Sequence, residues 1–141
     1  MKQDVYAPLD RDFTGDVQMV FKRTLDKLTE EKGILGCLLV DCEGLVVSES
    51  LGSGRKDPEE VAALAGMLTN FLEHWFGEMD GSPFDQCVLS TDSSSMAIRK
   101  VGCLYLVVFL KGSGLSGYMA NIVTISEAVA TIAMMLQRTC G

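Results

Sequence analysis

The stretch CLYLVVFL at Cys103–Leu110 decides the fold of this 141-residue chain. Its apolar residues follow one another without alternation, which is typical of a strand that is covered on both faces. The run Cys37–Val40 has the same pattern, so both runs are predicted to be central strands. Only Val101 and Gly102 separate Cys103–Leu110 from the β-prone run Ser95–Lys100. So short a connection makes these two strands antiparallel neighbours.

The remaining strands are predicted from short β-prone runs. Gly36–Asp41 and Leu45–Glu49 are joined by Asp41–Gly44, where Asp and Gly suit a four-residue turn, so the two runs predict a hairpin. Phe84–Ser90 predicts a third strand, and Asp85 is its only charged residue. An uncharged strand at a sheet edge tends to pair with another strand.

Three helices are predicted from apolar residues that recur every three or four positions. The first begins at Asp16 and ends at Gly33. The second begins at Asp57-Pro58, an N-cap followed by a first-turn proline, and is expected to end at Gly77. The third runs from Leu115 to about Arg138. The residues expected to face the core are Val61, Leu64, Ala65, Leu68, Phe71, Leu72 and Trp75 in the second helix and Leu115, Met119, Ile122, Val129, Ala133 and Leu136 in the third.

The element order is therefore α-β-β-α-β-β-β-α, an α+β fold in which a five-stranded antiparallel sheet is covered by helices on both faces. A doubly wound parallel sheet is disfavoured because several connections are too short for crossovers. Residues 1–16 are expected to form an extended N-terminal lead-in, and residues 17–141 a single domain.

Composition excludes several classes of function. The net charge of −7 argues against binding a nucleic-acid backbone, which needs basic residues. The longest apolar run, Cys103–Leu110, is too short to insert across a membrane. No export signal opens the sequence, so the five cysteines are expected to be reduced thiols in the cytoplasm, with Cys37 and Cys103 buried as small apolar residues.

No catalytic, cofactor-binding or metal-binding residue is predicted. Gly112–Gly117 spells G-x-G-x-x-G, but the second parallel strand and the acidic residue of a dinucleotide site are missing. The glycines are instead expected to form a flexible connection, with close packing at Gly117. The chain has no C-x-x-C pair and a single histidine, His74, so neither a zinc site nor a Cys/His nucleophile is supported.

The second helix carries a face that we interpret as an intermolecular surface. No Lys or Arg occurs from Pro58 to Gly77, although solvated helix faces are usually rich in both. If Phe84–Ser90 lies at the sheet edge, two copies can join across it and form a symmetric homodimer. The residues predicted for this surface are Ala62, Ala63, Gly66, Asn70, Glu73, Gln86 and Val88. Gly66→Arg is expected to leave the fold intact and to weaken self-association.

These motifs together resemble the roadblock (dynein light chain) family. The resemblance rests on Gly33–Gly36, the hairpin Asp41–Ser48, the helix start Glu59–Gly66, and Met96–Val101 with the apolar strand after it, and it covers about residues 17–138. It implies a roadblock/profilin-like sheet between helices, dimerisation through the third strand and second helix, and no catalytic residues. Members of the family commonly bind or regulate Ras-like small GTPases, and the chain looks most like the prokaryotic MglB-type regulators.

Three functions follow as hypotheses. The first is a non-enzymatic homodimeric regulator of a Ras-like small GTPase that stimulates GTP hydrolysis indirectly; an arginine finger, if used, would be Arg55 or Arg99. The second is a structural scaffold, or a module like the dynein light chains, without a GTPase partner. The third is a small-molecule sensor or enzyme that uses Gly112–Gly117 or Cys42.

Overall fold

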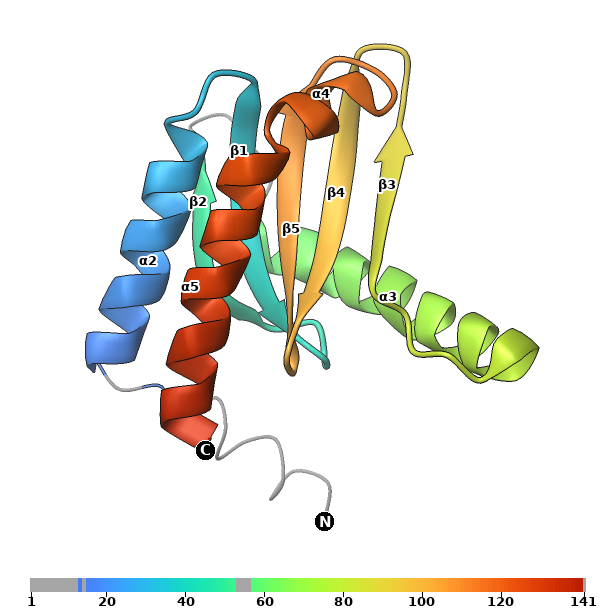
Figure 1. Cartoon of the computed structure of the whole chain (residues 1–141), viewed down its shortest axis with the longest axis horizontal. Helices are drawn as coiled ribbons and strands as arrows, with labels where there is room; N and C mark the ends of the chain where they lie inside the picture. The colour runs from blue at the N-terminus through green and yellow to red at the C-terminus, as the bar shows by residue number, and fades with distance from the viewer. Residues whose placement is uncertain (1–12, 14, 53–56, 141) are drawn as a thin grey trace.

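A computed structural model describes residues 13, 15–52 and 57–140 of the chain. Its centre is one five-stranded sheet in the order β2-β1-β5-β4-β3, and every neighbouring pair is antiparallel. The strands are β1 (Ile34–Asp41), β2 (Val46–Leu51), β3 (Gln86–Ser90), β4 (Ser94–Val101) and β5 (Leu104–Lys111). Figure 1 shows β5 in the middle of the sheet and β3 at one edge.

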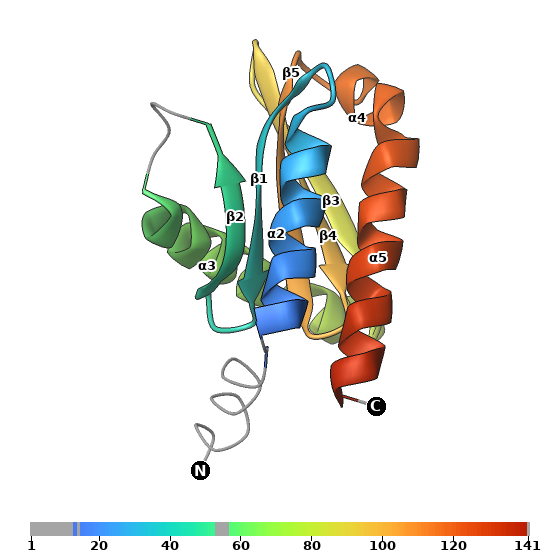
Figure 2. The same ribbon diagram turned by 90° about the vertical axis from the view of Figure 1, so that its left-hand side faces the viewer.

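Helices cover both faces of the sheet, as Figures 1 and 2 show. Two long helices lie side by side on one face, and a single helix crosses the other. The helices are α2 (Gly15–Thr29), α3 (Pro58–Asp80), α4 (Ser116–Ala120) and α5 (Ile122–Cys140), with α2 and α5 forming the pair. The predicted α+β fold with a helix-covered antiparallel sheet is confirmed.

Each face of the sheet forms its own core with the helices that cover it, because alternate residues of each strand point to opposite faces. The core under α2 and α5 is the larger and is rich in big side chains such as Phe21, Leu25, Leu106 and Ile132. The core under α3 is smaller. Its buried members are Leu38, Val40, Ala62, Ala65, Phe84, Ile98, Tyr105 and Val107.

The two strands predicted to be central are central. β1 pairs with β5 from Ile34 to Asp41, and Leu38, Leu106 and Val107 are fully buried. Burial of both faces explains why their sequences are apolar without alternation. The predicted hairpin between β1 and β2 and the tight turn between β4 and β5 are also present.

The predicted helices differ from the structure in three places. The first ends at Thr29 rather than at Gly33, because the chain turns between residue 30 and Gly33, whose φ of 92° is left-handed. The second helix continues past Gly77 to Asp80 and ends at Gly81, whose φ of 73° is left-handed, because Gly77 is tolerated inside the helix where nothing contacts it. The third helix is broken at Asn121, whose side-chain amide donates to the Gly117 carbonyl.

The break changes which residues of the last helices face the core. Leu115 and Met119 were expected inside but are 59% and 57% exposed. Tyr118, Ile125 and Ile132 are buried in their place.

The N-terminal boundary also differs from the expectation. Phe13 lies within the expected lead-in, yet it is buried, and its ring meets Phe21 edge-on with 5.3 Å between centroids. The helix begins at Gly15. The rest of the lead-in, residues 1–12 and 14, lies outside the described residues, as do residues 53–56 with Arg55. Within the described part of the chain, no helix combines the length and apolar character needed to cross a membrane.

Candidate protein-interaction site

The small residues of α3 face the chain's own sheet. Ala62 and Thr69 are fully buried, and Ala65 is nearly so. A Cβ atom on Gly66 would lie 2.7 Å from the Cα of Gly44 in the β1–β2 turn. At that separation two backbones are in contact, so only glycine fits.

This packing corrects the predicted intermolecular face. Ala62, Gly66 and Glu73 were expected to meet a second molecule, but they turn toward the sheet. The physical reason is the close approach of α3 to the β1–β2 turn, which requires small side chains on the inner side of the helix. Ala63 and Asn70 are exposed, as the prediction requires. Larger residues of α3 beside them are exposed as well and make up most of the surface.

Large apolar side chains of α3 point outward instead. We call Leu64, Met67, Phe71, Trp75 and Met79 the outer stripe; their exposed fractions are 57%, 69%, 59%, 50% and 65%. They recur every three or four residues and therefore share one side of the helix. The rings of Phe71 and Trp75 stack with centroids 6.1 Å apart.

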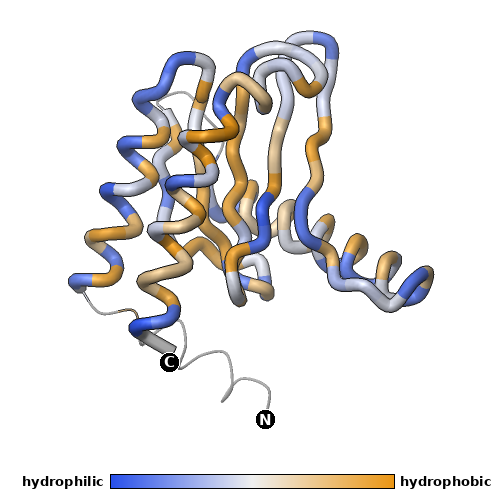
Figure 3. Tube along the Cα trace, viewed as in Figure 1, coloured by the Kyte–Doolittle hydropathy of each residue, from blue (hydrophilic) through white to orange (hydrophobic). Residues whose placement is uncertain are grey.

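The sequence prediction that placed Leu64, Phe71 and Trp75 in the core was therefore wrong. Val61, Leu68 and Leu72 do pack against the core, but only at the flanks of the helix. Figure 3 shows hydrophobic residues along α3 out to the end that projects past β3. A row of large exposed apolar side chains of this kind makes α3 the candidate protein-interaction surface of the described residues.

The edge position of β3 adds a second element to this surface. Within the described residues, β3 pairs only with β4, so one side of its backbone has no strand partner there. Gln86 is exposed, and its side-chain oxygen accepts a hydrogen bond of 3.0 Å from the Tyr118 hydroxyl. Val88 is half-buried and packs toward the α2/α5 core, while Leu89 is 44% exposed. The edge strand and the outer stripe are consecutive in the chain.

A polar cluster ties α3 to the strands beside it. The Glu73 carboxylate accepts hydrogen bonds from the Phe84 backbone N–H at 3.1 Å, the Lys100 ammonium at 2.8 Å and the Tyr105 hydroxyl at 2.6 Å. Phe84 starts the segment that leads into β3, so Glu73 positions both halves of the surface. We call these four residues the Glu73 clamp.

The clamp shifts the pKa values of its members. Partial desolvation raises the pKa of Glu73, but the hydrogen bonds from Lys100, Tyr105 and Phe84 outweigh it and hold that pKa below its ordinary value. Burial, together with the Glu73 charge, raises the pKa of Tyr105. Glu73 is therefore ionised and Tyr105 neutral at physiological pH.

The surface is also the most acidic part of the chain. Residues 57–98 hold eight acidic residues and no Lys or Arg. Their summed negative charge is therefore larger in magnitude than the net charge of −7 of the whole chain. The rest of the chain carries a nearly balanced set of charges. The interaction surface thus combines apolar side chains with a negative surround.

The other residues considered as binding or catalytic candidates do not form a common site in the structure. β5, which precedes the glycine segment, has only antiparallel neighbours, so it does not belong to a dinucleotide-binding unit. A Cβ on Gly117 would lie 2.8 Å from the Lys111 carbonyl oxygen, which confirms close packing there. His74 is exposed on α3, and Arg99 is held by a 3.2 Å hydrogen bond to the Tyr118 hydroxyl.

Cys37 is a structural cysteine. Cys37 is fully buried, as expected, and its thiol donates to the Leu25 carbonyl at 3.3 Å. Burial raises its pKa to about 11, which disfavours the reactive thiolate. Cys103 is half-buried beside the α2/α5 core. No cluster of His, Cys, Asp and Glu suited to a metal occurs among the described residues.

Comparison with known proteins identifies the family to which this fold belongs. The family model described as "Roadblock/LC7 domain" matches residues 20–109. The chain belongs to the Roadblock/LC7 domain family. Among curated proteins, no sequence matches it.

Several solved structures share the fold. MglB of Myxococcus xanthus superimposes with a TM-score of 0.79 at 16% identity, over 89% of this chain and 94% of that one. An MglB described as having a tetrameric arrangement gives 0.74 at 15% identity over the same shares, 89% and 94%. A Roadblock/LC7 domain from Streptomyces avermitilis gives 0.61 at 21% identity, over 83% of this chain and 92% of that one.

Proposed function

We propose that the chain is a non-enzymatic homodimeric adaptor that regulates a Ras-like small GTPase in the cytoplasm. The observation that carries the proposal is the outer stripe of α3 beside the open edge of β3. The outer stripe exposes large apolar side chains to solvent. The edge of β3 exposes backbone donors and acceptors with which another strand can pair.

The homodimer follows from the geometry of these two elements. Two copies of β3 related by a two-fold axis would pair edge to edge, and the projecting ends of the two α3 helices would then lie close together. Such an interface is self-complementary, as a two-fold interface must be. An MglB with the same fold has a tetrameric arrangement, which supports self-association in this fold.

The GTPase partner rests on the family. The resemblance to MglB-type regulators implies such a partner, and the fold shared with MglB supports the assignment. Any stimulation of hydrolysis is proposed to be indirect. Arg99 is half-buried and held by Tyr118, which disfavours its insertion into a partner's active site, and Arg55 lies outside the described residues.

The test is GTP turnover by the small GTPase that co-purifies with the chain, measured with and without it. We expect faster turnover with the wild-type chain, loss of the effect with Phe71→Asp, and retention of most of it with Arg99→Gln. Faster turnover abolished by Arg99→Gln alone would establish an arginine finger and overturn the indirect mechanism. Binding without any change in turnover would leave the scaffold function.

A further inference from the structure

The outer face of α5 is a second surface that lacks charge. From Gly112 to Gln137 the only charged residue is Glu127. Val123 and Met134 are 68% and 62% exposed, and Ala130 between them is exposed as well. These three residues and Glu127 are spaced by three or four positions, so they share one side of the helix. We call them the α5 stripe.

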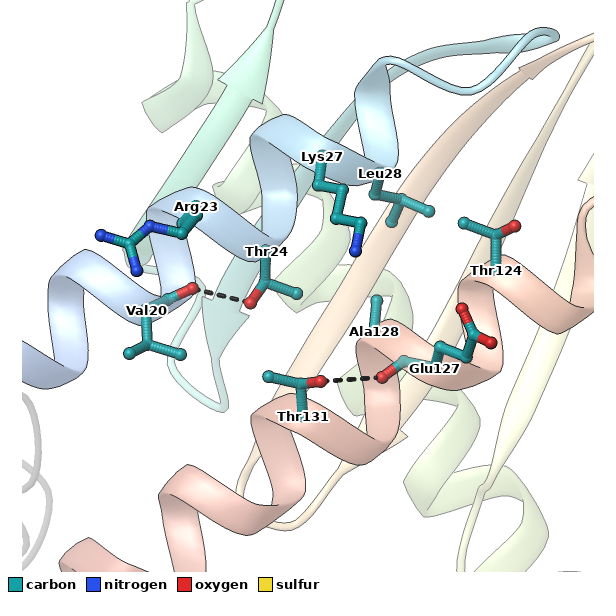
Figure 4. A pocket seen from close by; sticks show the side chains of 9 residues that line it. All are labelled: Val20, Arg23, Thr24, Lys27, Leu28, Thr124, Glu127, Ala128 and Thr131. Carbon is teal, nitrogen blue, oxygen red and sulfur yellow. Dashed lines mark hydrogen bonds between the residues drawn. The ribbon is translucent and has the colours of Figure 1, made fainter.

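A groove runs beside this stripe, between α2 and α5. It has a volume of about 280 Å³. Figure 4 shows Arg23 and Lys27 on the α2 side and Glu127 on the α5 side, with Val20 and Ala128 also lining the groove.

The charged residues of the groove have no ion-pair partners in the described part of the chain. The only ion pairs there are Lys22–Asp26 and Lys100–Glu73. Arg23, Lys27 and Glu127 therefore offer two cations and one carboxylate to an incoming molecule. The Thr131 hydroxyl donates to the Glu127 carbonyl within its own helix, so it does not satisfy the carboxylate.

We propose that this face binds the same face of a second copy of the chain. A two-fold interface brings a residue i of one copy against a residue j of the other, and j against i, so charged residues attract across it when the same surface carries both signs of charge. This face carries both signs: Glu127 of one copy would meet Arg23 and Lys27 of the other, and the two α5 stripes would pack together. The acidic segment 57–98 lies mainly on α3 and β3, so this arrangement keeps its eight acidic residues, which no Lys or Arg of that segment balances, away from the contact.

The consequence is a chain with two self-association surfaces on opposite layers. If the proposed contact through β3 and α3 forms as well, the protein assembles beyond a dimer. This larger assembly therefore rests on the proposed function. Without that contact, the α5 stripe still gives a dimer of its own. The two surfaces can therefore be tested separately.

The test is sedimentation velocity of the full chain over a concentration series with charge-swap variants. We expect Glu127→Lys alone, and Arg23→Glu with Lys27→Glu, to halve the mass of the largest species. Combining all three substitutions is expected to restore it, because the charges are again complementary. Glu43→Lys makes the same charge change at an exposed residue of the β1–β2 turn, outside both surfaces, and is expected to leave the mass unchanged.

A variant of the other surface separates the two contacts. Phe71→Asp is expected to leave a dimer that Glu127→Lys then converts to a monomer. The proposal is overturned if Glu127→Lys leaves the mass unchanged, if the triple variant fails to restore it, or if Phe71→Asp alone gives only monomers. If Phe71→Asp has no effect while Glu127→Lys does, the α3 contact fails and the α5 contact stands.

Discussion

The two faces of the sheet are covered in opposite ways. On one face, α2 and α5 bury large side chains such as Phe21 and Ile132, although Val123 and Met134 of α5 stay exposed. On the other face, α3 buries Ala62, Ala65 and Gly66 and exposes Phe71 and Trp75. The difference shows that a helix which approaches a backbone closely must turn its small side inward, and its large apolar side then becomes available to another molecule.

The strongest test of this contrast is to enlarge the inner side of α3. Gly66→Val is expected to destabilise the fold by about 3 kcal/mol, because its Cβ would meet backbone atoms of Gly44 rather than a flexible side chain. Urea unfolding followed by circular dichroism measures the loss. The same reasoning corrects the expectation for Gly66→Arg, which would disturb the fold as well as self-association.

Gly77 is the matched control for Gly66. It lies in the same helix, and a Cβ there would contact nothing within 4 Å. Gly77→Ala is expected to stabilise the protein by about 1 kcal/mol through helix propensity. Equal effects at the two glycines would contradict the close approach of α3 to the β1–β2 turn.

A smaller effect is expected on the outer side of α3. Phe71→Asp should weaken self-association by about 2 kcal/mol, since a central aromatic residue is lost and a charge is placed in the contact. The stability of the separated chain should hardly change because the side chain is 59% exposed there. Sedimentation equilibrium measures the dissociation constant. Leu45→Asp, at a residue 53% exposed away from β3, is the control and should have no effect.

A substitution in the Glu73 clamp tests how α3 and the segment that leads into β3 are held together. Glu73→Gln is expected to cost about 1 kcal/mol at neutral pH, a modest value because the carboxylate is partly exposed to solvent. Glu78→Gln, an exposed residue of the same helix, should cost nothing measurable.

The pH dependence of this cost has a definite sign. The pKa of Glu73 is lowered in the folded state from its ordinary value of 4.5. Its contribution is therefore present in full above that value and is lost as pH falls through the lowered folded pKa. Urea unfolding at a series of pH values should show the wild type and Glu73→Gln converging in acid. A difference that grows on acidification would refute the clamp.

The smallest expected effect is that of salt on the α3 contact. Residues 57–98 carry only negative formal charge, so two such surfaces repel each other at long range. Raising NaCl from about 50 to about 500 mM should tighten this contact by about threefold. It should weaken the α5 contact, which pairs opposite charges. Measuring Glu127→Lys and Phe71→Asp separately isolates the two responses.

Much of the fold could be predicted from the sequence because the relevant signals are local. The unalternating apolar runs of β1 and β5 identify strands covered on both faces. Asp57 and Pro58 mark the start of α3, where the Asp57 carboxylate accepts from the Glu59 N–H. The end of α3 was missed because Gly77 and Gly81 are both plausible stops, and only the conformation of the chain separates them.

The site was less predictable than the fold. The absence of Lys and Arg directed attention to α3, but the direction of its faces was inverted. Ala62, Gly66 and Glu73 have the composition of a contact surface, and their contact is with Gly44, Phe84 and Tyr105 of the same chain. The α5 stripe was missed because the last helix was read only for its core-facing residues, and neither Val123 nor Met134 was among them.

The sequence by itself determined the order of the elements, the central strands and the absence of Lys and Arg from the second helix. Hydrophobic periodicity and capping depend on residues that are close together in the chain, so they can be recognised in the amino-acid sequence alone. Only the tertiary structure decided which side of each helix is covered. That choice depends on how closely a helix axis approaches the sheet and its turns, and at Gly66 the backbone of Gly44 sets the distance.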